Sequence, residues 1–475
     1  MSDITRIPYI SRAVMPSLLD SADSRPIHFV GIAGAGMSAL AELFTVRGIV
    51  VTGCDTHPEN ATDLARLGIT VQGQHSPDHV EPCRALVVTS AMPKNHPELV
   101  RARELGLPVI RRAEALAEAT AGTTLVGVAG THGKSTTTVL TTEALAAAGL
   151  APTGYVGARV SAWGGNLRSG GATHFVVEAD EYDRSFLALS PTVAVVTNLE
   201  ADHLDIYADL DDLRRTFAQY IRGARWIVLC ADDHEANRLP TPATAEVIRY
   251  GIASPDARLR ATNLRREGLG TRFDVLYDGK PCGEVALAVP GEHNVWNALA
   301  ALATGIALGV TVAQMAPGLA AFRGVERRFQ MLGEAGGVMV VDDYAHHPTE
   351  VRATVEAART AAPDRRLVIA FQPHLFSRTR DFRREFAEAL AEADVVFLAD
   401  IYAAREQPIT GVTSQLIADD MVALGKAPAW IGPRVLLADA LAEAVRPNDL
   451  VVTMGAGDVT HVGRMLLRAL GAPPA

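Results

Sequence analysis

The stretch of sequence that decides the fold reads Thr124-Leu125-Val126-Gly127-Val128-Ala129-Gly130-Thr131-His132-Gly133-Lys134-Ser135. Its first half is apolar, its second half is rich in glycine, and a helical pattern follows through Ala148. In a strand–loop–helix of this kind, glycines let backbone N–H groups approach phosphate oxygens, and the helix N-terminus adds the positive end of its dipole. The stretch therefore predicts a phosphate-binding loop in an α/β domain.

Lys134 and Ser135 carry the expected chemistry of this loop. The lysine would reach the β- and γ-phosphates of a nucleotide, and the hydroxyl would ligate Mg²⁺. The strict pattern G-x-x-x-x-G-K-[ST] is not met, because its first glycine position is Val128. The alternative is an ordinary strand–turn–helix corner. Only four lysines occur among 475 residues, however, so a lysine in this position is not expected by chance.

Two polar clusters follow the next strands along the chain. The run 178–183 contains four carboxylates after the apolar stretch 174–177, and the run 198–205 follows the apolar stretch 193–197 with an asparagine, a histidine and further carboxylates. Taken alone, each cluster is typical of a polar loop with helix caps. Because the carboxyl ends of parallel strands meet at one edge of a sheet, a carboxylate of the first run and an imidazole of the second are expected to share a divalent ion beside the phosphate loop.

A second glycine-rich loop occurs in the N-terminal part of the sequence. Gly31, Gly34 and Gly36 follow the apolar run 27–30 and fit the pattern G-x-G-x-x-A, with Asp55 near the end of the next strand. This spacing predicts a diphosphate at the start of a helix, and NAD or another nucleoside diphosphate fits it equally well.

The C-terminal part contains two polar runs after strands, at 342–348 and 371–380. Arg378 and Arg380 could clamp a carboxylate or a phosphate, although structural salt bridges explain them as well. Adjacent histidines at 346 and 347 lack a third ligand at zinc spacing, so no zinc site is expected there. The run 322–329 carries three arginines where two domains would meet, with a solvated charge run as the alternative.

Strands alternating with helices predict an α/β chain of three domains with doubly wound parallel sheets. We place an N-terminal extension at 1–24 and domains at 25–120, 121–322 and 323–475. A net charge of −10 argues against a nucleic-acid partner. The N-terminus lacks an apolar signal segment, and the apolar tract 295–322 is better explained by two packed helices than by a membrane span. Four cysteines without C-x-x-C spacing indicate reduced, mostly buried thiols, so a soluble cytoplasmic protein is expected.

From about residue 26 to residue 465 the chain resembles the Mur ligases of peptidoglycan synthesis. The resemblance is carried, in order, by the runs Gly31–Ser38, Gly130–Ser135, Glu178–Glu181, Asn198–His203, Gly291–Ala298, Arg327–Phe329 and Asp342–Pro348. It implies a Rossmann-like UDP-binding domain, a central P-loop-type ATPase domain and a Rossmann-like C-terminal domain that closes over the site.

The resemblance also implies a reaction. ATP would phosphorylate the lactoyl carboxylate of UDP-N-acetylmuramate, and the amine of L-alanine would attack the acyl phosphate. Ligases of the family that add later amino acids carry a carbamylated lysine shortly after the metal histidine. No lysine occurs here between Lys134 and Lys280, which favours the branch that adds L-alanine. A monomer or a homodimer is expected.

Residue roles are carried over onto matching positions. The catalytic group would be Lys134, Glu178, His203 and Arg327, with two Mg²⁺ ions, replaceable by Mn²⁺, on Ser135, Glu178 and His203. ATP would be held by Gly130, Thr131, His132, Gly133, Lys134, Ser135, Asn294, Asn297 and Asp343. The substrates would be held by Gly34, Gly36, Met37, Ser38, Asp55, Ser90, His346, Arg378 and Arg380.

One departure concerns the alanine carboxylate. The L-alanine branch often has an arginine directly after the histidine of the Phe-Gln-Pro-His run, and this chain has Leu375. The carboxylate would then rely on Arg378 alone or on Arg380.

Three other functions remain open at this point. A ligase of wall recycling would attach a preformed peptide to the same UDP-sugar. An NAD-dependent dehydrogenase would use the Gly34 loop but leaves the Gly130 loop unexplained, and an ATP-switched binding protein would lack ligase chemistry.

Overall fold

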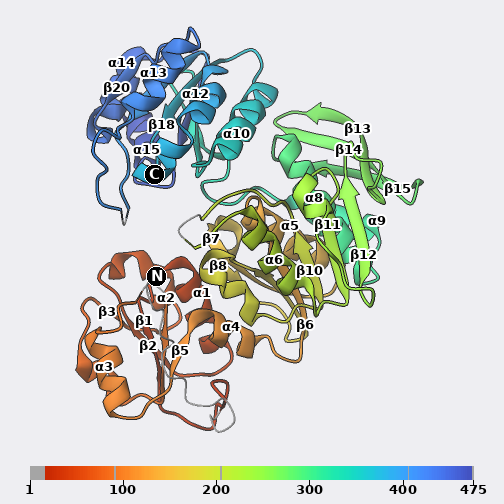
Figure 1. Cartoon of the computed structure of the whole chain (residues 1–475), viewed down its shortest axis with the longest axis vertical. Helices are drawn as coiled ribbons and strands as arrows, with labels where there is room; N and C mark the ends of the chain where they lie inside the picture. The colour runs from red at the N-terminus through yellow and green to blue at the C-terminus, as the bar shows by residue number, and fades with distance from the viewer. Residues whose placement is uncertain (1–16, 90–91, 204–205, 405, 473–475) are drawn as a thin grey trace. The chain divides into compact units, whose positions relative to one another are not determined.

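The computed structural model describes residues 17–89, 92–203, 206–404 and 406–472. Within these residues the chain forms three sheets of mostly parallel strands, which follow one another along the chain from red to blue in Figure 1. The chain divides into two compact units, Met1–Arg260 with Leu299–Gly318, and Ala261–Ala298 with Leu319–Ala475. The three sheets confirm the predicted fold class, whereas the exact domain boundaries stay predictions.

The first sheet belongs to the first unit, and its strands are parallel in the order β3-β2-β1-β4-β5. Its elements are β1 (Ile27–Val30), α1 (Ala35–Val46), β2 (Val51–Cys54), the 3₁₀ helix η2 (Pro58–Ala61), α2 (Thr62–Ala65), β3 (Val71–Gln72), η3 (Pro77–Val80), β4 (Ala85–Val88), α3 (Pro97–Glu104), β5 (Val109–Arg111) and α4 (Arg112–Ala119). Side chains alternate across β1, so Phe29 lies in a core with residues of α1 and α4, whereas Val30 lies in a core with residues of η3 and α3. Helices thus cover both faces of this sheet.

The second sheet has the order β12-β11-β10-β6-β9-β7-β8 within the first unit. Its elements there are β6 (Thr124–Ala129), α5 (Lys134–Ala147), β7 (Thr153–Val160), η4 (Ser161–Trp163), β8 (Gly165–Arg168), β9 (His174–Glu178), η5 (Tyr182–Ala188), β10 (Val193–Val196), α6 (Leu210–Ile221), β11 (Trp226–Cys230), α7 (His234–Asn237) and β12 (Glu246–Gly251).

Strand β6 is the middle strand of these seven. It pairs in parallel with β10 on one side and with β9 on the other, in a register that sets Ala129 beside Val196 and Val128 beside Glu178. The carboxyl ends of β6, β9 and β10 therefore meet at one edge, as the sequence predicted.

The chain then runs through β13 (Leu259–Glu267) into the antiparallel hairpin of β14 (Gly270–Tyr277) and β15 (Lys280–Leu287). Asp278 and Gly279 form its turn with φ values of 48° and 75°, as a two-residue turn of type I′ requires. The apolar tract that follows forms α8 (Glu292–Ala307) and α9 (Val312–Ala321), which confirms the two expected helices. Among the described residues, no helix combines the length and the apolar character needed to cross a membrane.

The third sheet lies in the second unit in the order β16-β17-β21-β18-β19-β20, with only the pair β16 and β17 antiparallel. Its elements are β16 (Gln330–Ala335), β17 (Val338–Asp343), α10 (Pro348–Ala361), β18 (Arg366–Phe371), α11 (Phe376–Asp381), α12 (Arg383–Ala391), β19 (Val395–Ala399), α13 (Gln415–Ala423), β20 (Trp430–Gly432), η6 (Arg434–Leu436), α14 (Leu437–Ala444), β21 (Asp449–Met454) and α15 (Thr460–Ala469). One apolar core joins the sheet to α10, α12 and α13, and another joins it to α14 and α15.

Candidate active site

The loop 130–133 joins β6 to α5, where the sequence places a phosphate site. Gly130 and Gly133 have φ values of 136° and 81°, a region that favours glycine. A Cβ atom on Gly130 would lie 2.0 Å from Oγ1 of Thr197, so the loop packs against the end of β10 without room for a side chain. Asn198 fixes the loop further, because its Oδ1 accepts from the His132 N–H at 2.8 Å and its Nδ2 donates to the His132 carbonyl at 3.1 Å.

The side chain of Lys134 folds back over this loop. Its Nζ donates to the carbonyl oxygens of Gly130 at 2.6 Å and Thr131 at 3.0 Å, and to Oε1 of Glu181 at 2.8 Å. Burial alone would lower the pKa of Lys134. The negative charges of Glu181 and Asp180 have the larger combined effect, so the pKa is raised above its usual value. The ammonium group is therefore held charged at the mouth of the loop.

Glu181, the carboxylate that accepts from Lys134, is buried. Burial raises its pKa to about 7, with Lys134 acting in the opposite direction. Its Oε2 atom is buried and makes no hydrogen bond within the described residues. The hydroxyl of Tyr207 donates to the backbone carbonyl of Glu181 at 2.6 Å, which anchors the start of η5.

Glu178, at the end of β9, faces the first residues of α5. Both of its carboxylate oxygens accept from the Ser135 hydroxyl at 3.0 Å, and Oε2 also accepts from the Gly157 N–H at 2.7 Å. A carboxylate and a hydroxyl in contact are oxygen donors of the kind that Mg²⁺ prefers, so the residues present fit this ion.

His203 lies in the loop after β10, with a φ of 53°. Its Nε2 is 3.7 Å from Oε1 of Glu181 and 3.9 Å from Oδ2 of Asp202, and its ring packs edge-on against Tyr182. The structure thus brings His203 together with Glu181, and Glu178 together with Ser135. The sharing of one ion by Glu178 and His203 stays a prediction.

The glycine loop of the first sheet is held by Asp55. Its two carboxylate oxygens accept from the N–H groups of Ala33 and His57, each at 2.9 Å. Gly34 is the N-cap of α1. A Cβ on Gly36 would lie 2.4 Å from Nη1 of Arg112, so this helix start closely approaches a guanidinium group.

The remaining residues predicted for this loop differ in their surroundings. Met37 is buried in the core, and the Ser38 hydroxyl donates to the Ala35 carbonyl within α1. Ser90 lies outside the described residues.

In the second unit, the side chains of Asp343 and Arg327 make hydrogen bonds to backbone groups near the start of β16. The carboxylate of Asp343 accepts from the N–H groups of Phe329 at 2.6 Å and Ala345 at 2.7 Å, and burial raises its pKa to about 6. Arg327 donates to the carbonyls of Gly455 and Gly457 at 2.6 and 3.2 Å and lies over the ring of Tyr344.

The two arginines predicted for the alanine carboxylate differ. Arg378 is buried, with Nη1 3.4 Å from Nδ1 of His374, whereas Arg380 is exposed and paired with the adjacent Asp381. His346 has its Nδ1 3.1 Å from Oε2 of Glu350, and its ring lies 5.6 Å from that of His374. His346, His374 and Arg378 therefore form one polar group.

The two asparagines predicted for adenine lie one turn apart on α8. Both are buried, and Nδ2 of Asn297 donates to Oδ1 of Asn294 at 3.2 Å. Nδ2 of Asn294 donates in turn to the Pro290 carbonyl at 2.6 Å.

Known proteins match the chain over nearly its whole length. Residues 26–124 match the family model described as the Mur ligase family catalytic domain, 128–305 the Mur ligase middle domain, and 327–457 the Mur ligase glutamate ligase domain. A protein of Salinibacter ruber is 42% identical over 94% of this chain and 95% of its own length, and one of Acidothermus cellulolyticus is 45% identical over 93% and 94%. The chain belongs to the Mur ligase family.

The two relatives described above share one protein name. Both proteins above are named UDP-N-acetylmuramate–L-alanine ligase. A solved structure of a UDP-N-acetylmuramate-alanine ligase from Thermotoga maritima has a TM-score of 0.80 at 30% identity, covering 93% of this chain and 98% of that one. A murein peptide ligase from Psychrobacter arcticus has a TM-score of 0.68 at 25% identity, covering 95% and 100%.

Two contacts of this Mur ligase site were not expected from its sequence. Glu181 was predicted as part of the acidic cluster but not as the partner of Lys134, and Arg112 beside Gly36 had no predicted role. Strand order could have suggested the first contact, since Glu181 follows the neighbour of β6. Nothing in the sequence pattern signals the second.

Proposed function

We propose that this Mur ligase joins L-alanine to the lactoyl carboxylate of UDP-N-acetylmuramate, converting ATP to ADP and phosphate. The full-length identity to ligases of that name supports the choice of substrates. The single structural observation that carries the ATP-dependent step is Lys134, held charged by Glu181 at a loop that opens α5.

Phosphoryl transfer asks mainly for positioning and for neutralisation of charge on the phosphate oxygens. Lys134 can supply that charge, because γ-phosphate oxygens can replace the two loop carbonyls that its Nζ now contacts. The loop N–H groups and the N-terminus of α5 would cradle the remaining oxygens. Arg327 is the proposed second cation.

Mg²⁺ would be held by Ser135 and Glu178, and a second ion by Glu178 with His203. Bound there, the ions supply charge neutralisation between two anionic reactants. Glu178 already orients the Ser135 hydroxyl, so this chain prepares the oxygen ligands before the ion binds. Mn²⁺ is expected to substitute, because it accepts the same carboxylate and hydroxyl oxygens.

The substrates would bind at the other two groups of residues. The diphosphate of the UDP-sugar would lie at the Gly34–Gly36 helix start, where Arg112 adds a cation. The alanine carboxylate would be bound by Arg378 with His346, since the charge of Arg380 is taken up by Asp381. Asp343, Asn294 and Asn297 would hold the nucleoside of ATP.

Release of phosphate with each substrate omitted in turn tests this function. Phosphate should require ATP, UDP-N-acetylmuramate and L-alanine together. If the preformed tripeptide replaces alanine with higher kcat/KM, the protein is instead the recycling ligase. Phosphate release independent of both other substrates would mark an ATP-switched protein, and a fluorescence titration with NADH checks the dehydrogenase alternative.

The reactants also bear on where the protein works. ATP and UDP-sugars are used in the cytoplasm, and we propose that location for this ligase. A monomer or homodimer is proposed, to be checked by light scattering.

A further inference from the structure

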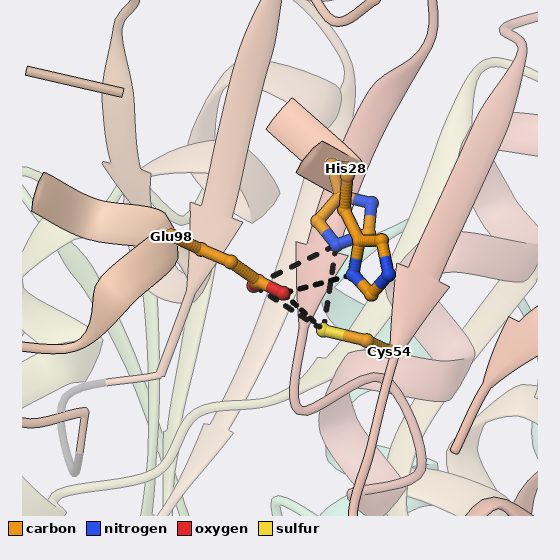
Figure 2. Close-up of side chains that lie close together, drawn as sticks. His28, Cys54 and Glu98 are labelled. Carbon is orange, nitrogen blue, oxygen red and sulfur yellow. Dashed lines mark hydrogen bonds and ion pairs between the residues drawn. The ribbon is translucent and has the colours of Figure 1, made fainter. Parts of the chain in front are cut away.

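Four side chains of types that can bind a metal ion lie close together at the first sheet, whereas the ATP loop follows β6 of the second sheet. They are His28 on β1, Cys54 at the end of β2, His79 in η3 and Glu98 on α3. One donor atom from each lies within 4.8 Å of all the others. His28, Cys54 and Glu98 are fully buried, and Figure 2 shows their side chains pointing toward one another.

The donor-atom distances among His28, Cys54 and Glu98 are close to those around a tetrahedral metal ion. Nε2 of His28 is 3.4 Å from Sγ of Cys54 and 3.7 Å from Oε2 of Glu98, and Sγ is 3.2 to 3.3 Å from the two carboxylate oxygens. Nδ1 of His79 is 3.0 Å from Oε1 of Glu98. Zinc bonds of 2.0 to 2.3 Å give tetrahedron edges of about 3.3 to 3.8 Å.

Further contacts orient the donors. Nδ1 of His28 lies 2.9 Å from Oγ1 of Thr52, and when Nδ1–H donates there the lone pair of Nε2 faces the cluster. The Ser76 N–H donates to Oε1 of Glu98 at 3.0 Å and fixes the carboxylate. Metal-binding histidines and carboxylates are held by such contacts in known sites.

Charge and donor type select the ion. A thiolate and a carboxylate would cancel the charge of one divalent cation, leaving a neutral group that burial tolerates. Two imidazoles and a thiolate suit Zn²⁺, whereas Mg²⁺ requires oxygen ligands.

We propose that His28, Cys54, His79 and Glu98 bind one Zn²⁺ ion in a closed, structural site that is separate from the Mg²⁺ sites of catalysis. On binding, the thiol of Cys54 loses its proton to solvent and a Zn–S bond forms. The ion would join β1, β2, η3 and α3. It would also fix Cys54, whose carbonyl accepts from the N–H groups of Gly31 and Ile32 in the glycine loop.

The test uses the full chain, stripped with a chelator, reloaded with Zn²⁺ or Co²⁺ and desalted in excess Mg²⁺. We expect one ion retained per chain and a higher Tm. The cobalt form should show a thiolate-to-cobalt charge-transfer band and the intense visible bands of a tetrahedral site. Absence of retained metal, or a cobalt spectrum without the thiolate band, would overturn the proposal.

Variants locate the ion. Cys54→Ser and His79→Gln should lose the retained metal and the gain in Tm, whereas Cys230→Ser, which changes a buried thiol on β11, should keep both. If Cys54→Ser retains the ion with unchanged spectrum, the site lies elsewhere and the proposal is wrong. If a variant does not fold, the thiolate-to-cobalt band of the unaltered protein still tests whether a cysteine binds the metal.

Discussion

Lys134 is the residue on which the ATP assignment depends most directly. Lys134→Ala should leave the fold intact and lower kcat by about 10²-fold or more, because a preorganised charge at the transferred phosphoryl group is lost. Lys94→Ala, a change at an exposed lysine, is the matched control. Near-normal phosphate release from a folded Lys134→Ala protein would contradict the assignment.

The proposed ligands Glu178 and His203 predict how activity depends on the Mg²⁺ concentration. Glu178→Ala and His203→Ala should raise the Mg²⁺ concentration that gives half-maximal activity, because each removes a proposed ligand, whereas Glu181→Ala should raise it less. Asp183→Asn, at a partly exposed carboxylate of the same cluster, serves as control. Metal titrations of phosphate release measure this, and unchanged dependence in both ligand variants would place the ion elsewhere.

Glu181 makes stability depend on pH. Its pKa is raised from 4.5 to about 7, so between these values the folded state binds more protons than the unfolded state. The free energy of unfolding therefore falls as pH rises through this window. Melting temperatures of the unaltered protein should fall, relative to Glu181→Gln, from pH 5 to pH 8. The control Glu356→Gln, at an exposed position on α10, should follow the unaltered protein.

At the scale of elements, strands β1, β6, β9 and β10 lie where the apolar runs predicted them, because each is buried and ends at a polar or glycine-rich loop. Strands β7 and β8 were not predicted. Glycines and polar residues interrupt their apolar pattern, and they pair with each other through an irregular register. Contacts between sequence-distant side chains, such as Lys134 with Glu181 or Cys54 with Glu98, depend on the packing of several elements, so spacing alone could not predict them.

Packing between β6 and α6 offers a test at this scale. A Cβ on Gly127 would lie 2.1 Å from the hydroxyl of Tyr220, which is buried and makes no hydrogen bond within the described residues. Gly127→Ala should destabilise the fold. Tyr220→Phe should be neutral or stabilising by up to about 1 kcal/mol, because an unsatisfied hydroxyl is removed. Denaturant unfolding of both variants and the double variant should show that Tyr220→Phe recovers part of the loss, and strict additivity would contradict this packing.

At the scale of the whole molecule, the proposed acyl-phosphate route predicts the fate of the carboxylate oxygens. Amide formation through an acyl phosphate requires that one carboxylate oxygen leave with phosphate, since oxide itself is no leaving group. UDP-N-acetylmuramate labelled with ¹⁸O in its lactoyl carboxylate should therefore transfer one labelled atom per turnover to phosphate, as mass spectrometry can measure. Unlabelled phosphate with normal amide formation would indicate adenylation or another route.

The scarcity of lysine has a practical consequence for handling the protein on surfaces. Lys134 is largely buried and holds its amine against loop carbonyls and Glu181, whereas Lys94 and Lys280 are exposed and Lys426 is partly so. Amine-directed coupling to a sensor chip or resin should thus use these other lysines or the N-terminal amine and spare the phosphate loop. Immobilised in this way, the protein should keep its nucleotide site available to compounds passed over it, which suits it to inhibitor screening by flow.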